Sequence, residues 1–146
     1  MKLSASAFLR DGKIYIQAFS KTKNGVWVAS GPVYVYVVEE ENSHQLGQKA
    51  LDALGRSRQG VPHPTQAEWK AIQEPMLQAA GVKSWTTFAK GAKAVGLNLE
   101  NDTITMEPSS DYANEGGTSL PEKKRYSKPV AQELGQALLE AFADCT

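Results

Sequence analysis

The chain has 146 residues, of which 41% are hydrophobic and 22% are charged. This length favours one domain over residues 1–146, and the composition excludes a disordered tail or a fibre. Sixteen Lys and Arg residues balance sixteen Asp and Glu residues. That balance argues against a dedicated nucleic-acid-binding protein and against a membrane-surface protein.

Cysteine content and hydropathy predict where the protein works. The single cysteine, Cys145, allows no internal disulfide, which fits a reducing compartment. The apolar N-terminal stretch is too short for a signal peptide. The longest later apolar run, residues 26–38, is well below the roughly 20 residues of a spanning helix. We therefore expect a soluble, cytoplasmic protein.

The first forty residues have the pattern of strands, with segments at residues 3–9, 13–20, 26–30 and 33–38. Asp11-Gly12 and Asn24-Gly25 favour tight hairpin turns, and Gly31-Pro32 separates the last two segments. The simplest arrangement is a meander of four antiparallel strands.

The middle third has helical periodicity. A first helix follows Asn42 and ends near Gly55 or Gly60. A second begins at the capping box of Thr65 and Glu68, contains Pro75, which should kink or divide it, and ends at Gly81. A third begins at Ser84 and ends at Gly96. Their apolar faces are predicted to bury Leu46, Ala50, Ala53, Leu54, Trp69, Ile72, Met76, Leu77, Ala80, Trp85, Phe88, Ala89, Ala92 and Val95.

The last third begins with strand character at residues 97–99 and 103–106, joined by a polar turn. Residues 108–121 resemble a long loop, and a final helix is predicted to start near Ser127 and Pro129. Its apolar stripe comprises Leu134, Leu138, Ala141 and Phe142. The expected fold class is α+β, with a mainly antiparallel sheet of about six strands packed with about four helices.

Catalytic signatures are missing from the sequence. It contains no phosphate-binding loop, no His-Glu-x-x-His motif and no nucleophile elbow, and two histidines with one cysteine are few ligands for zinc. We expect no metal, no cofactor and no enzymatic activity. His63, between Pro62 and Pro64, is either a hydrogen-bonded loop residue or a general base.

Two surface features stand out. Strand alternation predicts one aliphatic sheet face and one aromatic face that includes Tyr15, Phe19, Tyr34 and Tyr36, which is either covered or binds a protein. Residues 94–122 contain six acidic residues and no basic one, and residues 39–41 form a second acidic cluster. Such a stretch is either simply solvated or attracts a basic partner.

Several blocks of the sequence resemble one bacterial family. They are residues 4–8, 11–17, 30–35, 60–64 with Trp69, 81–85 and 114–118. In combination these blocks resemble the immunity proteins of contact-dependent growth inhibition systems, the CdiI type, across most of the chain.

The resemblance implies a non-catalytic intracellular antidote. Its partner would be the C-terminal toxin domain of a large exported effector, commonly a nuclease and in some cases a tRNase, without direct contact to nucleic acid or membrane. Because a nuclease is basic where it holds phosphates, we expect the toxin to contact the acidic stretch. The expected toxin-binding residues are Glu100, Asp102, Glu107, Asp111, Tyr112 and Glu115. Two alternatives remain: a small hydrolase using His63 with a nearby carboxylate, or a protein-interaction adaptor.

Overall fold

The N-terminal third forms three antiparallel strands in the computed structural model, which describes residues 2–114 and 116–146. They are β1 (Leu3–Arg10), β2 (Lys13–Thr22) and β3 (Trp27–Val37). The four-strand meander is therefore wrong. Gly31 and Pro32 lie inside β3, where the register against β2 shifts and Gln17 Nε2 donates to the Gly31 carbonyl at 3.0 Å. A bulge absorbs the Gly-Pro pair, and β3 lies at the end of the strand order, where a proline costs no ladder hydrogen bond.

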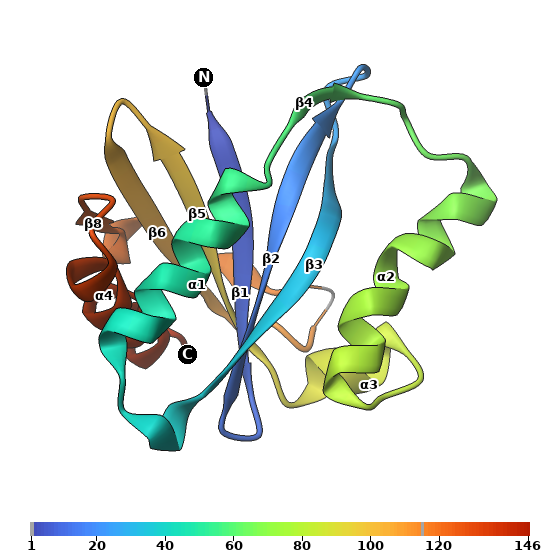
Figure 1. The fold of residues 1–146 in the computed structure, drawn as a ribbon. Coiled ribbons are helices and arrows are strands. Elements are labelled where there is room, and N and C mark those ends of the chain that lie inside the picture. The colour runs from blue at the N-terminus through green and yellow to red at the C-terminus, as the bar shows by residue number, and fades with distance from the viewer. Residues whose placement is uncertain (1, 115) are drawn as a thin grey trace.

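The remaining chain completes an α+β fold, as predicted, with a mainly antiparallel sheet in the order β3-β2-β1-β5-β6-β7 (Figure 1). In addition β4 pairs with β2 in parallel, and β8 pairs with β6. The further elements are η1 (Val38–Glu40), α1 (Ser43–Gly55), β4 (Gln59–Val61), α2 (Gln66–Ala80), α3 (Trp85–Lys90), β5 (Lys93–Glu100), β6 (Thr103–Ser110), β7 (Thr118–Ser119), η2 (Pro121–Lys123), β8 (Arg125–Ser127) and α4 (Ala131–Asp144).

Local capping explains where three of the helices begin. Asn42 accepts from the Gln45 N–H at the start of α1, and Ser84 accepts from the Thr87 N–H at the start of α3. Thr65 and Glu68 form the predicted capping box of α2. The helix runs unbroken through Pro75, which does not divide it. Pro75 lies on the exposed side of α2, so the carbonyl it leaves without an N–H partner is close to solvent.

Three boundaries differ from the prediction. α3 ends at Lys90, and Val95 and Gly96 belong to β5 because that segment completes the sheet between β1 and β6. The predicted loop is shorter, since β6 continues to Ser110 and pairs with β7. Ser127 ends β8 and does not cap α4. Instead the Glu133 carboxylate accepts from the Lys128 N–H at 2.7 Å, just before the helix.

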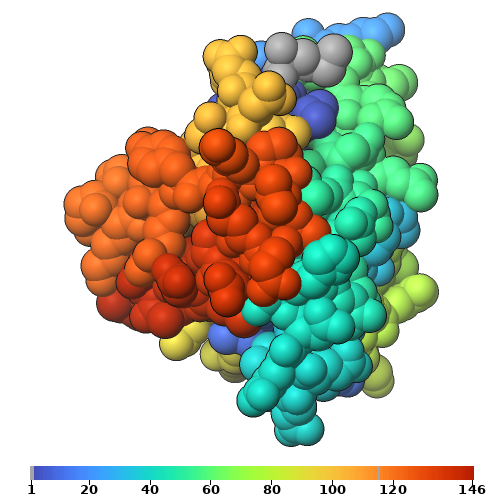
Figure 2. Space-filling model, turned by 60° about the vertical axis from the view of Figure 1, so that its left-hand side comes forward, coloured from blue at the N-terminus to red at the C-terminus, as the bar shows by residue number. Residues whose placement is uncertain are grey.

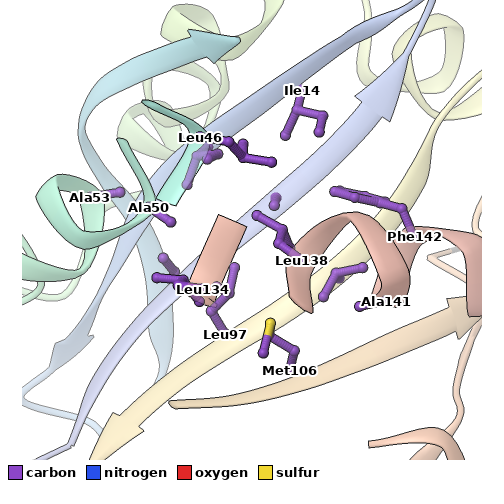
Figure 3. Packing of buried hydrophobic residues seen from close by; sticks show 14 of the residues in the cluster. Ile14, Leu46, Ala50, Ala53, Leu97, Met106, Leu134, Leu138, Ala141 and Phe142 are labelled. Carbon is purple, nitrogen blue, oxygen red and sulfur yellow. The ribbon is translucent and has the colours of Figure 1, made fainter. Parts of the chain in front are cut away.

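The first face of the sheet is covered by α1 and α4, which lie side by side over it (Figures 1 and 2). Strand residues that include Ile14, Leu97 and Met106 meet the apolar stripes of both helices there (Figure 3). The stripe predicted for the last helix is confirmed, because all four of its residues are buried. A Cβ at Gly47 would overlap the Ala131 carbonyl, and one at Gly135 would overlap the Ser43 carbonyl. Glycine at these two positions lets the helix backbones touch.

The second face is covered only at one end, by α3 and the C-terminal half of α2. Phe8 and Tyr15 of the sheet pack there against Met76, Leu77 and Phe88.

The predicted aromatic face does not exist. The register places Tyr36 opposite Ile14 and Tyr34 opposite Ile16, so these tyrosines share the first face with the aliphatic residues. Alternation within one strand does not tell which of its two sets of side chains shares a face with the neighbouring strand, because the pairing register decides that. The alternative of a sheet covered on both faces holds only in part, because helices cover the first face and one end of the second.

The two helical tryptophans differ in burial. Trp69 is 38% exposed, so its predicted place in the core is wrong, and Trp85 is half-buried. The N-terminal half of α2 diverges from the sheet (Figure 1), and the Trp69 ring there packs against His63 of the preceding loop.

Candidate functional site

The candidate site is the uncovered half of the second sheet face. In β5, Val95 and Leu97 point into the first-face core and are fully buried. Ala94, Gly96 and Asn98 therefore point to the second face. Side chains from β1, β2 and β6 join them, because Ser6 and Glu107 lie directly opposite Gly96 on its two sides.

This surface is hollowed. A cavity of about 340 Å³, which we call the sheet hollow, opens beside α3. Its lining combines aromatic rings, small residues of the central strands and polar groups. Its lining residues are Ser6, Phe8, Phe19, Trp85, Ala94, Val95, Gly96, Asn98, Glu107, Pro108, Ser109, Tyr112, Gly116 and Ser119.

The structure brings together two of the predicted toxin-binding residues, Glu107 and Tyr112, in the lining of the sheet hollow. Glu100 lies on the same face as Gly96 but at the far end of β5. The two residues are four positions apart, which is roughly 13 Å along a strand. Asp102 lies with it in the β5–β6 turn, where Asn101 and Asp102 both have positive φ. That turn projects at the top of the molecule (Figure 2).

The remaining two predicted residues follow β6. Asp111 is exposed, with φ of 52°, and its N–H donates to the Thr146 carbonyl at 2.8 Å. Glu115 lies outside the described residues. The acidic stretch is therefore not one patch: Glu100 and Asp102 occupy one end of the uncovered face, and Glu107 and Asp111 lie near α3.

Glu107 is partnered within the chain. Ser119 Oγ donates to Oε1 of its carboxylate, and Lys124 Nζ lies 3.9 Å from Oε2. The side chains of Glu107 and Lys124 are 29% and 38% exposed. At this separation and exposure the ion pair is weak, and water screens it further. The carboxylate remains available to a stronger cationic partner.

Tyr112 forms one side of the sheet hollow. Its ring lies 5.5 Å from that of Phe8, and it packs against the cluster under α3. Burial raises the pKa of its phenol, and a hydrogen bond from Trp85 lowers it to a smaller extent. Tyr112 is thus held in place before any partner binds, which reduces the entropy that binding would cost.

His63 makes the contacts of a loop residue. Its Nδ1 lies 3.3 Å from Thr22 Oγ1, and its ring meets the edge of Trp69 at 6.0 Å. The neighbouring carboxylate of Glu68 accepts from the Thr65 N–H in the capping box. Among residues 2–114 and 116–146, no group of three His, Cys, Asp or Glu side chains is placed to hold a metal.

Sequence reasoning missed Ser6, Gly96 and Asn98 as lining residues, and it named Phe19 only as part of the predicted aromatic face. The signal was present in β5, where small or polar residues alternate with Val95 and Leu97. It was obscured because the first part of that segment was assigned to a helix.

Comparison with known proteins identifies the family. A family model described as CdiI, CDI immunity protein, matches residues 34–145. The chain belongs to the CdiI family. CdiI proteins are toxin-binding and non-enzymatic, which removes the hydrolase alternative. No curated protein matches the sequence.

Solved structures agree with this fold. A protein of unknown function from Neisseria meningitidis has 17% identity and a TM-score of 0.82, and the alignment covers 100% of this chain and 96% of that one. A chain of the CdiA-CT/CdiI toxin and immunity complex from Yersinia pseudotuberculosis has 18% identity, a TM-score of 0.78, and coverage of 100% and 98%.

One further property bears on location. Within the part of the chain that the structure describes, none of the helices has the length and hydropathy to span a bilayer.

Proposed function

We propose that this immunity protein acts in the cytoplasm, where it binds and neutralises the C-terminal toxin domain of its own cell's effector. We further propose that this toxin is a nuclease, with tRNA among its candidate substrates. Membership of the CdiI family over residues 34–145 is the observation that carries the proposal. The structural likeness to a chain of a toxin and immunity complex supports it.

The binding surface in this proposal is the uncovered half of the second sheet face with its acidic ends. A nuclease must be positively charged where it holds phosphates. Carboxylates on the inhibitor speed the encounter with such a groove and take the place of phosphates within it. The residues proposed to contact the toxin are Glu100, Asp102, Glu107, Asp111, Tyr112 and Glu115.

Co-expression tests the function. The C-terminal domain of the exported effector encoded beside this gene is induced with and without the immunity protein. We expect growth arrest and nucleic-acid cleavage only without it, and a stable one-to-one complex from the purified proteins. A toxin domain from an unrelated effector is the matched control and should still arrest growth. Arrest by the neighbouring toxin despite the immunity protein would contradict the proposal.

A further inference from the structure

We propose that the sheet hollow receives one long basic side chain of the toxin, an arginine, and that Gly96 keeps the hollow open for it. This inference rests on the proposed function and adds to it the chemistry of the central contact. It assigns Gly96 as a residue that determines specificity.

Gly96 is not required by the fold. It lies in the middle of β5, without a positive φ, between Ser6 of β1 and Glu107 of β6. A Cβ built at this position would meet nothing within 4 Å. A glycine inside a strand weakens the strand, and it commonly marks a close approach by another molecule. The absence of a side chain at Gly96 therefore keeps the space above the strand open.

The surroundings of this space match a guanidinium group on an aliphatic stem. Phe8, Trp85 and, from β2, Phe19 line the sheet hollow. Aromatic faces attract an arginine head and pack against its methylene groups. Two polar acceptors in the lining, the carboxylate of Glu107 and the amide of Asn98, complete the set of partners that a planar cation uses.

In the free protein, Lys124 is the cationic partner of the Glu107 carboxylate. Its ammonium lies 3.9 Å from Glu107, longer than a charge-assisted hydrogen bond. An arginine from the toxin can form two parallel hydrogen bonds to the same carboxylate, and the surrounding rings exclude water from them. Binding therefore replaces a loose internal ion pair with a closer intermolecular one.

Filling the hollow tests the inference. Affinity for the neighbouring toxin domain is measured for the parent, Gly96→Ala and Gly96→Val, with Gly55→Ala as the matched control. Gly55 also has open space around its Cβ position, but it lies at the end of α1. We expect Gly96→Val to weaken binding roughly 100-fold and Gly96→Ala to fall between it and the parent. Gly55→Ala should remain within about twofold.

A second pair of variants tests the charge. Glu107→Gln keeps the acceptor for Ser119 but removes the negative charge, and Glu39→Gln is the control at an exposed acidic site. We expect roughly 30-fold weaker binding for Glu107→Gln and about twofold or less for the control. Thermal unfolding of each variant verifies that the fold is intact. The midpoint of Gly96→Val should be at or above that of the parent.

The outcomes separate the two proposals. If the parent binds the toxin domain and Gly96→Val binds it equally well, the inference is overturned and the antidote function stands. Lost binding by Gly96→Val with unchanged binding by Glu107→Gln would overturn the basic side chain in favour of an apolar one. If the parent does not bind the toxin at all, both proposals fail.

Discussion

Single aromatic residues differ widely in what they contribute to the second sheet face. Phe88 is fully buried and makes edge contacts with Phe8 at 5.4 Å and Tyr15 at 6.0 Å. Phe88→Ala should therefore lower the free energy of unfolding by about 3–5 kcal/mol. Trp69→Ala should lower it by less, about 1–2 kcal/mol, since Trp69 is 38% exposed and has less buried area to lose. Urea unfolding of both variants measures the difference, and equal losses would show that α2 packs more closely than described.

The phenol of Tyr112 links stability to pH. Burial raises its pKa above the ordinary value of 10.0, so as the pH rises the unfolded chain loses this proton first. The stabilisation from the protonated Tyr112 phenol is fully present below the pKa of the unfolded state. It is lost as the pH rises through the pKa of the folded state. We expect the free energy of unfolding to fall more steeply above pH 10.0 for the parent than for Tyr112→Phe.

Urea titrations at several pH values on either side of that point measure both slopes. Tyr15, whose pKa burial also raises, is present in both proteins and cancels in the comparison. Identical slopes would mean that the Tyr112 hydroxyl is solvated in the folded protein.

At the scale of elements, the contact between α1 and α4 depends on two glycines. A methyl group at Gly47 or at Gly135 would overlap a backbone carbonyl of the other helix, and backbone cannot move aside as a flexible side chain does. We expect Gly47→Ala and Gly135→Ala each to destabilise the protein by about 1–3 kcal/mol, despite the better helix propensity of alanine.

The matched control is again Gly55→Ala, in the same helix as Gly47 but with open space around it. It should leave stability unchanged or raise it by up to about 1 kcal/mol. Calorimetric unfolding of the three variants decides the matter, and a neutral Gly47→Ala would show that the two helices separate easily.

At the scale of the whole molecule, the fold covers one sheet face completely and the other only in part. A formal net charge of zero leaves no long-range attraction of the protein as a whole, so any steering must come from local clusters. Charged residues at the ends of the uncovered face are therefore expected to control the rate of association with the toxin.

Charge reversal distinguishes the two acidic clusters. Glu100→Lys combined with Asp111→Asn should slow association several-fold at low salt, and added salt should shrink the effect. The control is Glu39→Lys combined with Glu41→Asn, which makes the same change of charge. Asn is used at Asp111 and Glu41 because both have positive φ, which Asn tolerates. Stopped-flow rates that fall only for the control pair would move the binding surface to residues 39–41.

Local signals were sufficient to predict much of the fold. The hairpin at Asp11-Gly12 and the caps at Asn42, Thr65 and Ser84 follow from residues within four positions of one another. The α+β class follows from the order of the strand and helix segments along the chain. Turn and cap chemistry act over that distance, so they can be predicted without knowledge of the partner elements.

What the tertiary structure alone decided is which distant segments become neighbours. Strand order places Gly96 between Ser6 and Glu107, and this makes the sheet hollow. The divergence of α2 from the sheet leaves Trp69 exposed although its periodicity predicts burial. The sequence by itself determined the elements, because local hydrogen bonding and alternation act within each segment. The site depends on side chains brought together from segments about 90 residues apart, as Ser6 and Gly96 are, and only long-range strand pairing sets that contact.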